Sequence, residues 1–252
     1  MRQHLDTIPV WDAFKENSEC PLCSIREKNE AAYVDNFLGG SVMEPATRIE
    51  VNRKGFCERH LRHLFNAGNR LGLALMAHTH LKDSMERIEK NAEKLAAAAA
   101  TEGAKSFPQR AVGRLTRKPA ETRTPSEEAL AISESCILCD RLNNTMERYA
   151  LTILYMYKHE APFKAAFGAC KGFCLPHYAQ LAHLAPKELS GKDLQGFLEV
   201  LIRIERENLS RIEQEIDWFT QKFDYKNRDK PWGDSADALE RTVGKLRGKM
   251  TK

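Results

Sequence analysis

Two short cysteine motifs each occur twice, in the same order, in this chain of 252 residues. The first is Cys-x-x-Cys, which reads CPLC at residues 20–23 and CILC at residues 136–139. The second is Gly-Phe-Cys-x-x-His, which reads GFCERH at residues 55–60 and GFCLPH at residues 172–177. Two tight turns that carry cysteine and histidine are what a tetrahedral metal site requires. A fold that uses these motifs must therefore bring one motif of each kind together.

Other landmarks repeat with the motifs. Pro9 and Pro125 each stand eleven residues before the first cysteine, and Tyr33 and Tyr149 each stand ten residues after the second. The offset between the halves is 116 residues at Cys-x-x-Cys and 117 at Gly-Phe-Cys-x-x-His. So many matches in one order predict a tandem duplication with a long period.

Each half has the pattern of helices. We expect a short helix after Pro9 or Pro125, a second helix from Cys-x-x-Cys through the tyrosine, and a long helix that starts near Cys57 in the first half. Apolar residues keep helical spacing in the first long helix, at Leu71, Leu75, Leu81, Met85, Ile88, Ala92 and Leu95. They do the same in the second, at Leu194, Leu198, Leu201, Ile204, Ile212, Ile216 and Phe219. No segment reads as a strand, so the predicted fold is all-α: a duplicated helical unit with long helices packed as a bundle.

Composition divides the chain further. Residues 1–100 form the first predicted metal-binding repeat, and residues 125–224 form the second. Residues 101–124 are rich in Ala, Gly, Pro, Thr and basic residues and read as a flexible linker. Residues 225–252 read as a polar, basic tail.

Each half offers three cysteines and one histidine. Residues three apart on a helix share a face, so Cys-x-x-His at a helix start supplies two ligands, and the helix N-terminus favours thiolate over thiol. The predicted metal ligands are Cys20, Cys23, Cys57 and His60 in the first half, and Cys136, Cys139, Cys174 and His177 in the second. Pairing within a half is the simpler assumption, while exchange between the halves, with CPLC meeting His177, stays open.

Zinc is the usual ion of a Cys3His site, so two Zn²⁺ per chain are expected. An iron–sulfur cluster is the alternative, because it can also use three cysteines and one other ligand. A redox dithiol and plain buried cysteines are further readings of the same motifs. Cys170 has no counterpart, since Arg53 occupies its position in the first half. We read Cys170 as a bystander thiol, with a substitute ligand or reactive thiol left open.

Composition sets limits on compartment and partner. The N-terminal sequence lacks the apolar stretch of a signal peptide, and no window approaches the roughly 20 apolar residues of a membrane helix. We therefore expect a cytoplasmic protein, and in that compartment seven cysteines argue against a disulfide framework. The net charge of +4 does not require nucleic acid, which stays a weakly supported partner. Another protein is the favoured partner, and the oligomeric state is open.

The paired CPLC and GFCERH motifs, repeated as CILC and GFCLPH, resemble an uncharacterised bacterial domain-of-unknown-function family of helical proteins with CPxC and GFCxxH motifs. The resemblance covers both halves and implies a bacterial cytosolic protein, but it implies little about activity. The second half departs from the pattern, since Ile137 stands where Pro21 does. No nucleotide-binding, hydrolase or metalloprotease motif is present, so enzymatic activity stays undecided. The sequence favours a structural or protein-interaction module, with a redox or metal-transfer protein as the alternative.

Overall fold

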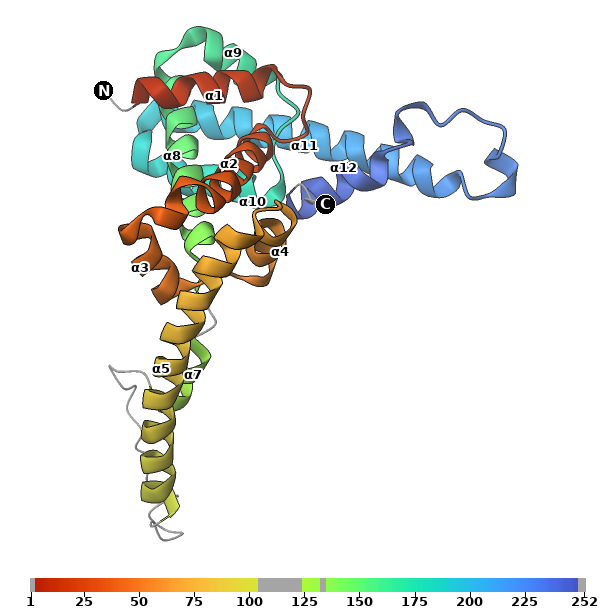
Figure 1. The fold of residues 1–252 in the computed structure, drawn as a ribbon. Coiled ribbons are helices and arrows are strands. Elements are labelled where there is room, and N and C mark those ends of the chain that lie inside the picture. The colour runs from red at the N-terminus through yellow and green to blue at the C-terminus, as the bar shows by residue number, and fades with distance from the viewer. Residues whose placement is uncertain (1–2, 104–123, 132–134, 249–252) are drawn as a thin grey trace. The chain divides into compact units, whose positions relative to one another are not determined.

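The computed structural model describes residues 3–103, 124–131 and 135–248, and these residues form α-helices and short 3₁₀ helices with no strand among them (Figure 1). The predicted all-α fold is therefore confirmed. The predicted linker at residues 101–124 lies almost entirely outside the described residues. The tandem duplication remains a prediction.

The chain divides into two compact units. Unit 1 comprises residues 1–29 and 142–252, and unit 2 comprises residues 30–141. The divisions fall inside two helices, α2 (Pro21–Leu38) and α8 (Ile137–His159). Each unit is therefore built from parts of both sequence halves.

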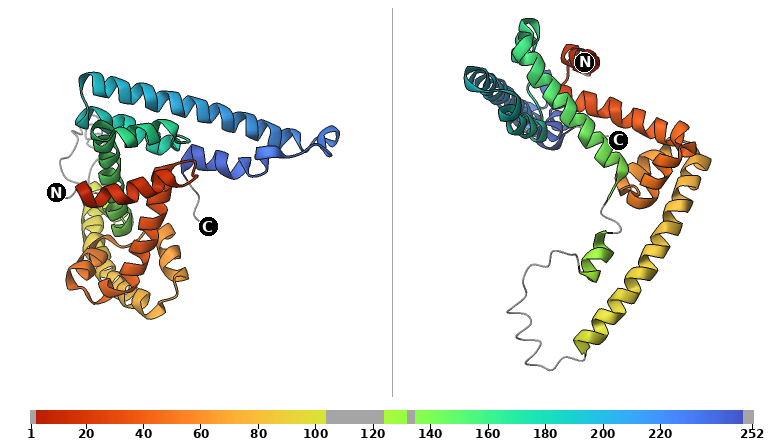
Figure 2. Two further views of the ribbon diagram at one scale, coloured as in Figure 1. Left: turned by 90° about the horizontal axis from the view of Figure 1, so that it is seen from above. Right: turned by 90° about the vertical axis from the view of Figure 1, so that its left-hand side faces the viewer.

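Unit 1 contains α1 (Gln3–Lys15), the start of α2, most of α8, then α9 (Ala161–Ala169), α10 (Leu175–Glu188), α11 (Gly191–Gln221), the short η2 (Tyr225–Asn227) and η3 (Gly233–Ser235), and α12 (Ala238–Arg247). Helix α12 folds back beside α11 (Figure 2). Phenylalanines fill the core: Phe167 is fully buried, and its ring centroid lies 5.6 Å from that of Phe173 and 5.2 Å from that of Phe197. Phe173 belongs to the second Gly-Phe-Cys motif, so this aromatic core reaches the cysteine that follows it.

Unit 2 contains the end of α2, the 3₁₀ turn η1 (Gly40–Met43), α3 (Pro45–Lys54), α4 (Glu58–Asn66), α5 (Arg70–Gly103), α7 (Pro125–Ala131) and the start of α8. Its core again surrounds the cysteine motifs. Phe37, Val51, Leu64 and Met76 are fully buried there, in one apolar cluster with Cys136. Phe56 packs edge-on against Phe37, with ring centroids 5.7 Å apart.

Two helix starts differ from the predictions. The long helix does not start near Cys57, because the chain breaks at Gly68, whose φ of +91° suits glycine, and α5 begins at Arg70. Asn69 then caps α5 by accepting a hydrogen bond of 2.9 Å from the backbone N–H of Gly72. Helix α1 starts before Pro9 and contains it, whereas Pro125 does begin α7, as predicted.

The predicted polar tail contains ordered structure. Helix α12 packs against α10 and α11, and Ala238 and Lys245 are buried. This helix has only ten residues, so its apolar pattern is brief, and it is rich in basic residues. These features explain why the sequence was interpreted as a tail here.

Candidate metal centres

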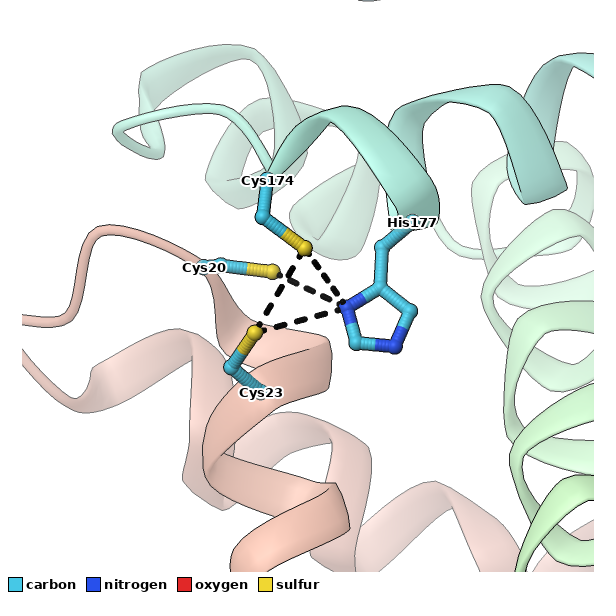
Figure 3. Close-up of side chains that lie close together, drawn as sticks. All are labelled: Cys20, Cys23, Cys174 and His177. Carbon is cyan, nitrogen blue, oxygen red and sulfur yellow. Dashed lines mark hydrogen bonds between the residues drawn. The ribbon is translucent and has the colours of Figure 1, made fainter. Parts of the chain in front are cut away.

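Cluster 1, formed by Cys20, Cys23, Cys174 and His177, lies wholly within unit 1 (Figure 3). Cys20 immediately precedes α2, and Cys23 lies in the first turn of that helix. Cys174 is the N-cap of α10, and His177 lies in its first turn. Two helix N-termini therefore converge on one point, where free N–H groups and the helix dipoles favour thiolates.

The ligand atoms of cluster 1 are closely spaced. His177 Nδ1 lies 3.4 Å from Cys20 Sγ, 3.5 Å from Cys23 Sγ and 3.2 Å from Cys174 Sγ. The sulfurs of Cys23 and Cys174 are 3.6 Å apart. All four residues are buried. Three sulfurs and one ring nitrogen thus face a common centre that is closed to water.

Other residues of the second half support cluster 1 without belonging to it. Gly172 turns the chain into α10 with a φ of +75°, and Glu205 accepts a 2.9 Å hydrogen bond from the backbone N–H of Phe173. The buried Lys245 of α12 donates to the carbonyls of Lys171 and Phe173. Helices α11 and α12 therefore hold the turn that presents Cys174.

Gly248, just after α12, lies directly over the sulfurs. A Cβ atom added there would lie 3.8 Å from Cys23 Sγ and 4.0 Å from Cys174 Sγ. Glycine allows the backbone to approach this closely at its φ of +91°. Nothing in the sequence pattern pointed to Gly248, Lys245 or Glu205 as neighbours of the site.

Cluster 2, formed by Cys57, His60, Cys136 and Cys139, lies wholly within unit 2. Cys57 is the N-cap of α4 and His60 lies in its first turn, while Cys136 and Cys139 stand at the start of α8. The first residue of α8 contacts the glycine turn, because the backbone N–H of Ile137 donates a 3.1 Å hydrogen bond to the carbonyl of Gly55.

The ligand atoms of cluster 2 are spaced like those of cluster 1. His60 Nδ1 lies 3.3 Å from both Cys57 Sγ and Cys136 Sγ, and 3.4 Å from Cys139 Sγ. The sulfurs of Cys57 and Cys139 are 3.7 Å apart. His60 and Cys136 are buried, whereas Cys57 and Cys139 are half-buried. Cluster 2 is therefore the more accessible of the two.

The outer nitrogen of His60 is held by a carboxylate. Its Nε2 lies 2.9 Å from Glu30 Oε1, and the other Glu30 oxygen accepts a 2.5 Å hydrogen bond from Arg59 Nη2. A proton on Nε2 leaves the Nδ1 lone pair directed at the sulfurs, which is the arrangement that metal-binding histidines commonly show.

Among the residues that the structure describes, no carboxylate holds the histidine of cluster 1 in this way. At the repeat offset of 116 residues, Met146 stands where Glu30 does, and at 117 residues Pro176 stands where Arg59 does. The hydrogen bonds that the described residues make to His177 are all at Nδ1. The two clusters share their ligand set but differ in the groups around it.

Charge within cluster 2 is organised around His60. Burial alone would lower the pKa of His60, but hydrogen bonds with Cys136 and Glu30 outweigh it and raise the pKa to about 10. Burial would raise the pKa of Cys136, but the hydrogen bond with His60 and those from the backbone lower it to about 6. The Cys136 sulfur is therefore a thiolate at neutral pH, the form that binds a metal.

In cluster 1, the hydrogen bonds with Cys174 and Cys20 hold the pKa of Cys23 far below its ordinary value. Burial raises the pKa of Cys20 well above its ordinary value. One sulfur of this cluster is thus also poised as a thiolate.

All eight predicted residues lie in the two clusters, but pairing within a half is wrong. CPLC of the first half meets Cys174 and His177 of the second, and CILC meets Cys57 and His60. The cause is the length of the helix that follows each Cys-x-x-Cys. The 18 residues of α2 span about 27 Å, so the chain leaves that helix far from its own CPLC.

The remaining candidates lie outside both clusters. Cys170 is the C-cap of α9, and burial raises its pKa to about 11, which fits a bystander thiol. Glu30 is a further neighbour that sequence reasoning missed. The sequence offers one indication of its role: Glu30 follows Cys23 by two helical turns on the same helix. The equivalent residue of the second half is not a carboxylate.

None of the helices in the described ranges combines the length and apolar character needed to cross a membrane. Comparison with curated proteins and with solved structures finds no match for the chain. A family model does match, and it spans residues 1–252. The chain therefore belongs to DUF6062, a family of unknown function.

Proposed function

We propose that each cluster binds one zinc ion and that the two zinc sites hold the helical units as a rigid scaffold for binding another protein. The proposed ligands are the eight residues of clusters 1 and 2. The cytoplasm is the proposed location, supported by seven cysteines that are all free of disulfides.

The spacing of the ligand atoms carries this proposal. With metal–sulfur distances of about 2.3 Å and a metal–nitrogen distance of about 2.0 Å, a tetrahedron places two sulfurs about 3.8 Å apart and sulfur and nitrogen about 3.5 Å apart. The corresponding distances are 3.6 and 3.7 Å between sulfurs, and 3.2–3.5 Å between sulfur and nitrogen. Both clusters therefore suit a single tetrahedral ion.

The same spacing supports zinc over an iron–sulfur cluster. In an iron–sulfur cluster the four protein ligands are divided over four irons, as in [4Fe–4S], or over two irons, as in [2Fe–2S], so the four ligand atoms as a set stand farther apart than around one ion. Here the four ligand atoms of each group lie within 4.8 Å of one another. Four protein ligands also complete a tetrahedron, which is typical of structural rather than catalytic zinc.

Metal analysis of the chain purified without oxygen tests the proposal. We expect about two zinc ions per chain and no absorption in the visible range, because zinc has no d-electron transitions. Cys170→Ser is a matched control: it removes a cysteine outside both clusters and should keep both ions. Iron with sulfide and a broad absorbance would overturn the zinc assignment, and absence of any metal would overturn the proposal as a whole.

Glu30→Gln should weaken metal binding at cluster 2 alone. The substitution keeps the size of the side chain but removes the charge that orients His60 and raises its basicity. Loss of such a partner costs about 10–100-fold in metal affinity. Titration with a competing chromophoric chelator should show one ion released earlier and the other unchanged.

Glu27→Gln, one turn earlier on α2, makes the same chemical change away from His60 and is the matched control. If Glu30→Gln released both ions like the wild type, the carboxylate would have no role in holding the metal. If it weakened both equally, the effect would be on the fold rather than on cluster 2.

A further inference from the structure

A stripe of exposed side chains, apolar except for one histidine at its start, runs along α5. It consists of His78, Leu81, Met85, Ile88, Ala92 and Leu95, and we call it the α5 seam. Leu81 is 59% exposed, Met85 and Ile88 are each 54% exposed, and Leu95 is 39% exposed. The sequence predicted a helical apolar stripe here, but much of it faces solvent instead of a core.

The other side of α5 is already occupied within unit 2. Asn91 is buried and donates a 2.8 Å hydrogen bond to the carbonyl of Pro125, and Lys94 pairs with Glu128 at 2.7 Å. Arg87 donates to the carbonyls of Asn52 and Arg53. These contacts hold α5 against α3 and α7 (Figure 1). Among the described residues, the seam lies on a face of α5 that these contacts leave exposed.

The spacing of the seam indicates what it binds. Its members are separated by 3, 4, 3, 4 and 3 residues, which is the heptad pattern of a coiled coil. The seam is about 26 Å long at 1.5 Å per residue. A stripe with this spacing fits another helix of matching pattern better than a sheet or a small ligand.

A second copy of α5 in antiparallel orientation matches the seam. When Met85 of one copy stands opposite Ile88 of the other, Leu81 faces Ala92 and His78 faces Leu95. The large side chain of Leu81 in each copy then packs against the small side chain of Ala92 in the other. Exchanging the two copies leaves every contact unchanged. The pairing therefore has two-fold symmetry, as a closed dimer requires.

The charges beside the seam favour this orientation. Lys82 and Glu89 follow Leu81 and Ile88 on the same flank, one heptad apart and opposite in sign. In the antiparallel register, Lys82 of each copy lies beside Glu89 of the other. In a parallel pair the same flank would face Ala77, Ser84 and Asn91, which carry no charge. Within the part of the chain that the structure describes, neither Lys82 nor Glu89 has an ion pair.

We propose that the α5 seam is a homodimer interface, in which two copies of this chain pair their α5 helices antiparallel with Lys82 against Glu89. No proposed metal ligand belongs to the seam. The interface therefore does not depend on the proposed function, and either proposal can be disproved while the other stands.

The test is the mass of the full chain in solution, measured by light scattering and sedimentation over a wide concentration range. The wild type should reach twice the chain mass as concentration rises. Leu81→Glu with Ile88→Glu should be monomeric at every concentration, with unchanged helicity and metal content. Ala97→Glu is the matched control, because Ala97 is exposed on α5 but lies on the opposite side of the helix from the seam; it should dimerise like the wild type.

Charge reversal tests the orientation. Lys82→Glu alone and Glu89→Lys alone should each weaken dimerisation on the order of tenfold, since each places like charges together twice. The double reversal should restore it. A wild type that stays monomeric, or a dimer that survives Leu81→Glu with Ile88→Glu, would overturn the interface. A dimer lost in that variant but indifferent to both single charge reversals would overturn the antiparallel pairing.

Discussion

Removal of metal is expected to unfold both helical units and not to leave a folded apoprotein. A structural zinc site contributes apparent free energies of about 10–16 kcal/mol in small zinc domains. The total free energy of unfolding of an ordinary domain is only about 5–15 kcal/mol. Each unit contains one proposed site at the meeting point of two helix N-termini. Loss of the ion therefore removes a stabilising free energy as large as the unit's total free energy of unfolding.

The structure shows why protein contacts would not replace the ion. In cluster 1, Cys20, Cys174 and His177 are buried together, and without a shared ion the thiols meet only each other and one ring. In cluster 2, the high pKa of His60 and the low pKa of Cys136 leave a buried imidazolium beside a thiolate. These two charges and the Glu30 carboxylate compensate one another, so the ion's contribution in cluster 2 is to bind the sulfurs of Cys57 and Cys139 to this group.

Far-UV circular dichroism during thermal unfolding, before and after treatment with a strong chelator, measures the effect. We expect the cooperative transition to disappear once both ions are gone and to return when zinc is added back. Cys170→Ser should behave as the wild type throughout. An apoprotein with unchanged helicity and transition midpoint would contradict a structural role, and would favour the metal-transfer alternative.

The two cysteine–histidine clusters could be anticipated from sequence as candidate ligands because much of their geometry is local. Cys20 with Cys23, and Cys174 with His177, are each fixed by one turn at a helix start, and spacing alone determines such a turn. The glycine that precedes each Cys-x-x-His is equally local: Gly55 and Gly172 have φ values of +63° and +75°. These parts of the site are set within six residues of chain.

The pairing of the motifs could not be identified in that way. It depends on where α2 ends and how the following helices pack, and no short-range pattern records that. The same holds for Glu30, which meets His60 across 30 residues of sequence. Helix α12 was also missed, because Lys245 reads as a solvated tail residue until the carbonyls of Lys171 and Phe173 are placed beside it.

Helix boundaries show the limit of periodicity. The apolar spacing from Leu71 onward is continuous, and it predicted a helix whose stripe would be packed. The break at Gly68 and the exposure of Leu81 and Ile88 come from what the rest of unit 2 covers. Periodicity reports that a face is apolar, and the partner that covers it can be another molecule.

Paired substitutions should lose one metal or both according to which residues are combined, and this separates exchanged pairing from pairing within a half. Cys20→Ser with His177→Ala damages cluster 1 twice, so about one zinc per chain should remain, because cluster 2 keeps four ligands. Cys20→Ser with His60→Ala damages both clusters, so close to no zinc should remain. Pairing within each half would reverse the two results.

Single substitutions give the control for that experiment. Cys20→Ser alone and His60→Ala alone should each keep about one zinc, since each leaves one Cys3His set intact. His63→Ala, one turn beyond His60 and outside both clusters, should keep both. If a single substitution already released both ions, peptide mapping after brief, mild oxidation of the zinc-bound wild type would decide, because the folded chain still holds the sulfurs in place. The sulfurs 3.6 Å apart in cluster 1 and 3.7 Å apart in cluster 2 predict disulfides of Cys23 with Cys174 and of Cys57 with Cys139. A disulfide of Cys23 with Cys57 would contradict the exchanged pairing.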